Sequence, residues 1–312
     1  MKRVPTNIVA SIHGRLLNLA RATNRPLNEL LQYFAIERFL YRFSLSTYRE
    51  QFVLKGAQML RAWEAPLARP TMDVDMLGGQ TANTIENLER IVRECCEIEI
   101  DDGVLFNLVS VRGEAINKDA EYKGVRVRAQ GTLGKIKLNV QIDFGFGDVV
   151  VPKPVPTELP QLLDLGAPRL LGYTPESAIA EKFQAMVALD LANTRIKDFY
   201  DIWSLGRVRE FDGVTLSMAI AAPFKRRATP LPEGAPLALT DAFSEDPTKQ
   251  ALWQAFLRKG RLDVEGKNLT EVVGGIRDFL LPPLRALNVG REFRSVWKDR
   301  QWNEIIPTCI TT

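Results

Sequence analysis

Two aspartates separated by a single residue are the feature of this sequence that most directly suggests chemistry. Asp73 and Asp75 alternate with apolar residues in the segment 72–76. In a β-strand, alternate side chains share a face, so the two carboxylates would project together while Val74 and Met76 point into the core. Like charges at this separation repel each other, and a bound divalent cation is the usual remedy.

A third aspartate, Asp143, lies between Ile142 and Phe144 in a second strand-like segment. If the two strands are neighbours, three carboxylates converge on one or two magnesium ions, with manganese as the alternative ion. Two such ions could activate an attacking hydroxyl and stabilise a leaving pyrophosphate. We therefore expect Asp73, Asp75 and Asp143 to be catalytic metal ligands, with a nucleoside triphosphate (NTP) as the substrate.

A short apolar strand, 52–54, is followed by Lys55, Gly56 and Ala57. Gly56 would allow the backbone to approach a triphosphate, and N–H groups at the start of the following helix, that of Ala57 included, could donate to its oxygens. Lys55 and Arg69 could neutralise phosphate charge. This segment therefore predicts a phosphate-binding turn beside the aspartates.

The surrounding pattern predicts the elements that would position these residues. Helices are expected within 1–48, near 84–94, from the Thr174-Pro175-Glu176 start, from Lys197, and near 248–259 and 268–287. Strands are expected at 52–54, 74–77, 104–111, 124–133 and 135–146. A hairpin is expected at 131–134 and a loop at 229–247. We expect an α/β (α+β) protein with a small mixed sheet flanked by N-terminal and C-terminal helices. The predicted domains are a helical region 1–48, a core 49–151 with the metal site, and a mostly helical domain 152–312.

Composition limits the classes of protein to which the chain could belong. The 312 residues include 41 Lys and Arg, 38 Asp and Glu, and one His, giving a net charge of +3 that permits a nucleic-acid partner without requiring one. Three cysteines do not suggest a disulfide framework. No apolar run approaches the roughly 20 residues that span a bilayer, and the N-terminus does not have the pattern of a secretion signal. We expect a cytoplasmic protein without a membrane partner.

The order of these motifs resembles the nucleotidyltransferase superfamily, and more closely the AbiEii/AbiGii toxin family. The similar segments are Leu54-Lys55-Gly56, Arg69-x-Thr71-x-Asp73-x-Asp75, 143–148, Glu176–Phe183 and Arg195–Ile202. The resemblance implies a nucleotidyltransferase fold, a nucleotide-binding role for Thr71 and functional roles for Lys182 and Asp198, with Lys182 holding the phosphates. Arg195 and Lys197 are weaker candidates. Ala57 stands where the superfamily has glycine or serine, so only its backbone could contact phosphate.

The resemblance also implies a toxin of a toxin–antitoxin or phage-defence system, paired with a cognate antitoxin. The related MenT toxins transfer nucleotides to the 3′ end of tRNA, so an RNA acceptor, tRNA in particular, is expected here. The alternatives are nucleotidylation of a protein hydroxyl, and a catalytically silent binding module with the same fold. A metal-dependent phosphohydrolase is a further rival. For Lys197 and Asp201 we expect an ordinary surface ion pair.

Overall fold

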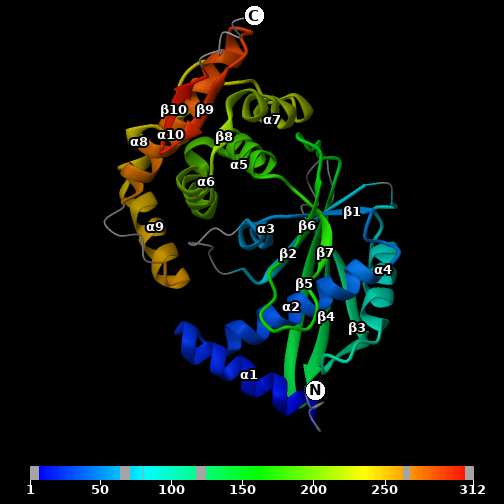
Figure 1. The fold of residues 1–312 in the computed structure, drawn as a ribbon. Helices are drawn as coiled ribbons and strands as arrows, with labels where there is room; N and C mark the ends of the chain where they lie inside the picture. The colour runs from blue at the N-terminus through cyan, green and yellow to red at the C-terminus, as the bar shows by residue number, and fades with distance from the viewer. Residues whose placement is uncertain (1–6, 64–70, 80, 117–123, 263–267, 306–312) are drawn as a thin grey trace, which may run out of the picture. The chain divides into compact units, whose positions relative to one another are not determined.

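The computed structural model describes residues 7–63, 71–79, 81–116, 124–262 and 268–305, which form two compact units (Figure 1). Unit 1 holds the described residues within 1–62, 70–147 and 155–172, and unit 2 those within 63–69, 148–154 and 173–312. This division differs from the three segments expected, because the helix α2 (Leu27–Leu45) of the N-terminal region packs on the central sheet of unit 1.

Unit 1 is built on a mixed sheet in the strand order β3-β4-β5-β2-β1-β7-β6. The strands are β1 (Phe52–Lys55), β2 (Asp73–Gly78), β3 (Val104–Ile116), β4 (Gly124–Leu133), β5 (Ile136–Phe146), β6 (Val155–Glu158) and β7 (Arg169–Gly172). β2 runs parallel to β5 and β1 parallel to β7, whereas the other pairs are antiparallel. The expected hairpin joins β4 and β5. The strands that carry the aspartates are therefore direct neighbours.

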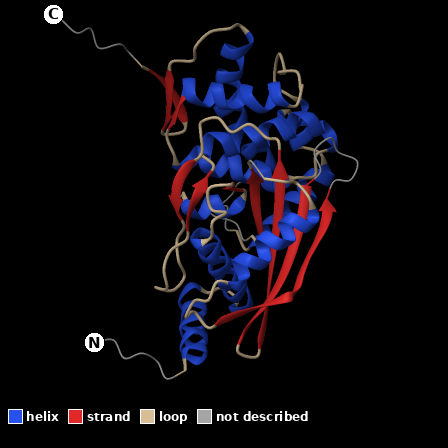
Figure 2. Cartoon of the chain, turned by 90° about the vertical axis from the view of Figure 1, so that its right-hand side faces the viewer, coloured by secondary structure: helices blue, strands red, loops and turns tan. Residues whose placement is uncertain are grey.

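One face of this sheet is apolar and covered by helices. Alternate residues of β5, such as Ile142 and Phe144, are fully buried. The Phe52 ring of β1 lies 5.2 Å from that of Phe144 and 5.7 Å from that of Phe43 on α2. α4 (Ile85–Glu97) packs on β3 and β4 beside α2. Figure 2 shows the long strands in red with helices alongside them. The same alternation places the polar residues of β2 and β5 on the opposite face.

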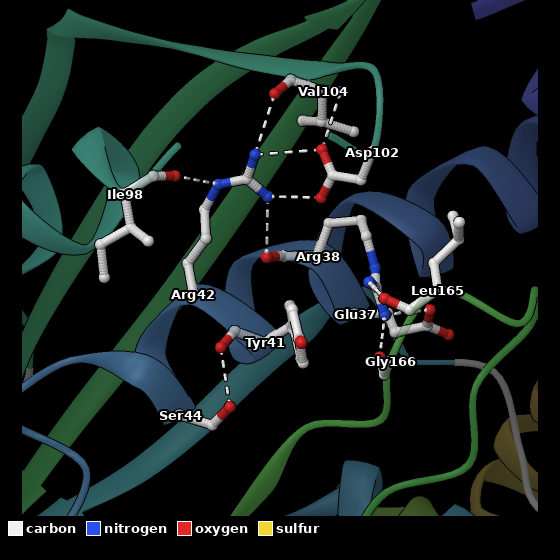
Figure 3. A network of polar contacts seen from close by, with 10 residues as sticks. All are labelled: Glu37, Arg38, Tyr41, Arg42, Ser44, Ile98, Asp102, Val104, Leu165 and Gly166. Carbon is white, nitrogen blue, oxygen red and sulfur yellow. Dashed lines mark hydrogen bonds and ion pairs between the residues drawn. The ribbon is translucent and has the colours of Figure 1, made fainter. Parts of the chain in front are cut away.

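Charged residues of α2 are buried in unit 1 (Figure 3). The Arg42 guanidinium donates to both carboxylate oxygens of Asp102, at 2.6 and 3.0 Å, and to the carbonyl of Val104 at 3.0 Å. Arg38 donates to the carbonyls of Leu165 and Gly166 at 2.8 and 2.6 Å. These contacts fix α2 to the start of β3 and to the loop before β7.

The remaining elements of unit 1 are two helices. α1 (Ile8–Thr23) precedes α2, and α3 (Ala57–Ala62) directly follows β1. Asn7 caps α1 by accepting a bond from the N–H of Ala10. Gly56 connects β1 to α3 with φ +72°, a conformation that glycine adopts without strain. The expected strand, glycine and helix order is confirmed.

Unit 2 is mainly helical and has its own core. Its helices are α5 (Pro175–Leu189), α6 (Ile196–Val208), α7 (Gly213–Arg226), α8 (Asp241–Ser244), α9 (Pro247–Gly260) and α10 (Leu269–Asn288), with 3₁₀ turns η1 (Asp190–Ala192) and η2 (Leu237–Leu239). Three short strands, β8 (Phe211–Asp212), β9 (Ser295–Lys298) and β10 (Gln301–Glu304), form a second sheet. Trp253 and Trp297 are buried among these elements.

The α/β class with flanking helices is confirmed, and most predicted elements are present. The sequence did not indicate α7, whose first residue is Gly213 and which contains Pro223, or the short strands β6 to β10. The expected loop 229–247 contains η2 and α8. None of the helices in the described segments is long and apolar enough to cross a membrane.

Candidate functional site

Four charged side chains on four adjacent strands form a row across the polar face of the unit 1 sheet. Asp75 of β2 is the register partner of Asp143 of β5. Arg126 of β4 lies opposite Asp143. Lys55 of β1 lies opposite Asp75. Because register partners project from the same face, these half-buried groups form a charge row in the order cation, carboxylate, carboxylate, cation.

Asp75 is fitted closely against the turn that precedes α3. A Cβ atom at Gly56 would lie 2.0 Å from Oδ2 of Asp75 and 2.8 Å from its Cγ, which is closer than atoms can approach. Only glycine therefore leaves room for this carboxylate, and it also suits the positive φ of the turn. The predicted role of Gly56 was close approach to a triphosphate; in the structure its missing side chain makes space for Asp75.

Asp143 is bound by an arginine that sequence reasoning missed. Nε and Nη2 of Arg126 donate to Oδ1 and Oδ2 of Asp143 at 2.8 and 2.7 Å. This two-pronged hydrogen bond raises the pKa of Arg126. The sequence signal for this arginine was the alternation of apolar and basic residues in 125–128, which places Arg126 and Arg128 on the face opposite to Val125 and Val127. Its pairing with Asp143 depends on the register of β4 and β5.

Asp73 lies one step further along the same face. Its register partner on β5 is Gln141, whose side-chain amide donates to Oδ1 of Asp73 at 2.8 Å. Within the described segments, no three His, Cys, Asp or Glu side chains are grouped in a way that could hold a metal ion. The structure thus brings Asp75 and Asp143 together as neighbours, with Asp73 beside Gln141.

The predicted phosphate-binding residues are distributed around this row. The Lys55 ammonium reaches across β2, so that a Cβ at Gly145 of β5 would lie 3.9 Å from it. Ala57 is buried at the start of α3. Thr71 is buried, and its N–H donates to the Tyr33 hydroxyl at 3.2 Å. Arg69 lies outside the described residues.

The donor set of the charge row fits a magnesium ion. Magnesium prefers oxygen ligands and is commonly held by one or two carboxylates, the remaining positions being filled by water and substrate phosphates. Asp75 and Asp143 supply two carboxylates from adjacent parallel strands. The Asp75 carboxylate occupies the space that a Cβ atom at Gly56 would fill, and it lies against the backbone of this turn.

The second predicted group, Lys182 and Asp198, lies in unit 2 on α5 and α6. Nζ of Lys182 is 2.9 Å from Oδ1 of Asp198 and 2.8 Å from Oδ2 of Asp201. Both carboxylates are almost completely buried. Nε of Arg195 approaches Oδ2 of Asp198 at 2.6 Å. This cluster of four charged residues joins the two helices. Lys182 therefore stabilises the contact of α5 with α6, in addition to the functional role that the resemblance implies.

The expected surface pair of Lys197 and Asp201 is wrong. Lys197 is exposed, whereas Asp201 is fully buried and pairs with Lys182 of the neighbouring helix. Residues at i and i+4 are neighbours on a helix, yet Lys197 lies at the exposed border of this face and Asp201 lies in its buried part. The partner of Asp201 is set by the packing of α6 against α5, which spacing within one helix does not reveal.

The chain is similar to a known protein family and to solved structures. The family described as nucleotidyl transferase AbiEii toxin, type IV TA system, matches residues 38–273. A solved structure of a candidate nucleotidyltransferase from Helicobacter pylori shares 17% identity over 84% of this chain and 96% of that chain, with a TM-score of 0.47. That of JHP933 from Helicobacter pylori shares 16% over 81% and 91%, with a TM-score of 0.45. The comparison with curated proteins gives no match. The family match spans both the charge row and the Lys182 cluster.

Proposed function

The chain belongs to the AbiEii nucleotidyltransferase toxin family, and on that premise we propose that it transfers a nucleoside monophosphate from an NTP to an RNA hydroxyl, at the 3′ end of a tRNA, with the help of magnesium. The observation that carries this proposal is the charge row, in which Asp75 and Asp143 lie side by side between two cations. Asp75 and Asp143 would hold the ion, while Asp73 lies one step further along the same face, bound by the Gln141 amide.

The proposed reaction is an in-line displacement at the α-phosphorus. The acceptor oxygen forms a new bond to this phosphorus, the bond to the bridging oxygen breaks, and pyrophosphate leaves with that oxygen. The proton of the acceptor hydroxyl passes to the carboxylate of Asp143. When bound, magnesium would neutralise phosphate charge and orient the reacting groups. The Lys55 ammonium would bind phosphate oxygens beside the carboxylates.

Arg126 occupies both oxygens of Asp143 in the structure. Its guanidinium therefore competes with an ion or a proton for the lone pairs of this carboxylate. When it moves away from Asp143, it provides a second cation for the charge of the triphosphate, at the end of the charge row opposite to Lys55. In this proposal Arg126 keeps Asp143 neutralised until substrate and ion arrive.

The experiment that tests this function follows the label of an α-³²P-labelled NTP. The full chain is incubated with magnesium and each NTP in turn, together with purified tRNA or with protein from a cell lysate. The Asp75→Asn variant keeps the shape of the side chain beside Gly56 but removes its charge. Glu114→Gln is the matched control, because Glu114 lies on β3 in an exposed pair with Arg128 at 2.7 Å.

We expect label on tRNA with the native chain and with Glu114→Gln, and a loss of at least about 100-fold with Asp75→Asn, comparable to removal of a group that stabilises the transition state. Label on lysate protein alone would support protein nucleotidylation instead. Consumption of NTP without labelled acceptor would indicate a phosphohydrolase. An absence of label, together with an absence of NTP and magnesium binding, would support the silent binding module.

The family also bears on the partners of the protein. Its description as a type IV toxin–antitoxin system implies that a cognate antitoxin accompanies this toxin. The proposed acceptor is tRNA, and the labelling experiment with separate NTPs tests this acceptor and identifies the preferred NTP.

A further inference from the structure

A cavity of about 270 Å³ in unit 2 lies outside both groups of predicted site residues. It is formed between α6, α10 and the hairpin of β9 and β10. The lining residues on which the argument depends are Trp203, Arg207, Gly275, Phe279, Trp297 and Arg300. All of them belong to elements of one compact unit. Its volume is near the lower end of the roughly 300–1,000 Å³ found for small-molecule pockets, which suits one ring with one attached group.

The walls of the cavity are aromatic, and one of them carries an unused hydrogen-bond donor. Trp203 and Trp297 are 7% and 4% exposed. The indole N–H of Trp297 donates to the Gly206 carbonyl at 2.6 Å. That of Trp203 has no acceptor within the described part of the chain, and it is not among the polar atoms sealed from solvent there. The Trp203 N–H is therefore an open donor in an otherwise buried side chain of the cavity wall, available to a ligand in the cavity.

A glycine on α10 keeps this donor accessible. A Cβ atom at Gly275 would lie 3.4 Å from Cδ1 and 3.7 Å from Nε1 of Trp203, which is ordinary van der Waals contact. The absent side chain therefore leaves open the edge of the indole that bears the N–H group. An alanine would fit here without displacing its neighbours, and it would fill the space that a ligand atom needs to reach Nε1.

Two arginines without anionic partners face the same cavity. The Arg207 guanidinium lies 4.7 Å from the centroid of the Trp203 ring, and Arg300 lies at the hairpin turn with φ +62°. Neither forms an ion pair or side-chain hydrogen bond with any residue of the described segments, although Glu271 and Asp278 also line the cavity. Burial, and then the charge of Arg300, lower the pKa of Arg207. Glu271 and Asp278 are exposed. The two guanidinium groups repel each other, and an anionic group that accepts hydrogen bonds from both would relieve this repulsion.

We propose that this cavity binds a small planar organic anion, consisting of one flat ring that carries a phosphate or carboxylate group. The ring packs against Trp203, Trp297 and Phe279. The oxygens of the anionic group accept hydrogen bonds from the indole N–H of Trp203 and from the guanidinium groups of Arg207 and Arg300. The ligand is either a free aromatic acid or the base and phosphate of a nucleotide, since both share this chemistry.

The test measures binding of phenyl phosphate to the full chain by calorimetry and by ligand-observed NMR, without NTP. Benzyl alcohol is the neutral control for the ring, and inorganic phosphate is the control for the anion. Adenosine monophosphate tests whether the ring can be a nucleobase. The key variants are Gly275→Ala, which fills the space beside Trp203, and Gly274→Ala, its neighbour on α10, where an added Cβ would have nothing within 4 Å.

We expect phenyl phosphate to bind with a dissociation constant of about 1 mM or lower, and benzyl alcohol and inorganic phosphate at least about tenfold more weakly. Gly275→Ala should weaken binding about tenfold or more without lowering the melting temperature, because alanine favours a helix over glycine. Gly274→Ala should bind like the native chain. Tighter binding of adenosine monophosphate than of phenyl phosphate identifies a nucleotide ligand if Gly275→Ala weakens it to the same degree, because that variant alters the cavity and not the charge row. The reverse order of affinities identifies a free aromatic acid.

Three results would overturn the proposal. The first is an absence of phenyl phosphate binding at concentrations up to about 10 mM. The second is equal binding of phenyl phosphate and benzyl alcohol, which would leave no role for the arginines. The third is equal weakening by Gly275→Ala and Gly274→Ala, which would place the ligand elsewhere. Because no NTP, magnesium or acceptor is present, these outcomes are independent of the nucleotidyl-transfer proposal.

Discussion

The carboxylates of the charge row have cationic register partners supplied by the protein itself. The Asp-x-Asp spacing suggested that repulsion between aspartates requires a metal ion, yet Arg126 already binds Asp143 and Lys55 lies opposite Asp75. An ion at Asp143 must therefore compete with a guanidinium. The affinity of the proposed site for magnesium should therefore depend on Arg126.

Removal of the competing guanidinium should strengthen magnesium binding. In Arg126→Gln, Asp143 loses two hydrogen bonds to a charged group, contacts that contribute about 1.5–3 kcal/mol. We expect magnesium to bind about tenfold more tightly than to the native chain, as measured by calorimetric titration. Arg128→Gln is the matched control, because Arg128 lies on the same face of β4 but contacts Glu114 and Gln141. Equal affinity in both variants would mean that Asp143 does not bind the ion.

At the scale of a single element, α4 shows how an amphipathic helix buries ionisable groups. Thr84 caps the helix by accepting a bond from the N–H of Asn87. Its inward side includes Leu88, Cys95 and Cys96, which are buried. Burial raises the pKa of both thiols to about 12. The thiols therefore act as small apolar groups in the helix–sheet contact.

The stability of this contact should decrease in alkaline solution. An unfolded thiol ionises near pH 9 and the folded one near pH 12, so the stabilisation is fully present below pH 9 and is lost as the pH rises from 9 towards 12. The slope is up to about 1.4 kcal/mol per pH unit for each thiol. Urea unfolding across this range should show a steeper decrease for the native chain than for Cys95→Ala/Cys96→Ala. Identical slopes would contradict the assignment.

At the scale of the whole molecule, the buried charges of Figure 3 tie together parts of unit 1 that are distant in the sequence. Arg42 on α2 binds Asp102 before β3 with both groups almost fully buried. Arg38 on the same helix binds the carbonyls before β7. All these segments belong to unit 1, whereas unit 2 has a separate aromatic core around Phe279 and Trp297.

Breaking this network should destabilise unit 1 in particular. Asp102→Asn leaves the Arg42 charge buried without its carboxylate, a loss expected to cost about 3–5 kcal/mol. Hydrogen exchange should accelerate at the amides of α2 and the sheet while those of α6 and α10 keep their protection. Glu94→Gln, which breaks an exposed pair with Arg90, should cost less than about 1 kcal/mol. Uniform loss of protection in both units would refute the assignment of the network to unit 1.

Local patterns in the sequence determined the alternation that places Asp73, Asp75 and Asp143 on the polar face, the order of strand, glycine and helix at Gly56, and the start of α5 at Thr174. These features depend on residues that lie at most about four positions apart, so the local sequence is sufficient to reveal them. Only the tertiary structure decided which groups meet. The register of β2 and β5 sets Asp75 beside Asp143 and Asp73 beside Gln141, and helix packing gives Asp201 to Lys182. Such pairings depend on contacts between residues far apart in the chain, where the shape of the whole core selects one register among several.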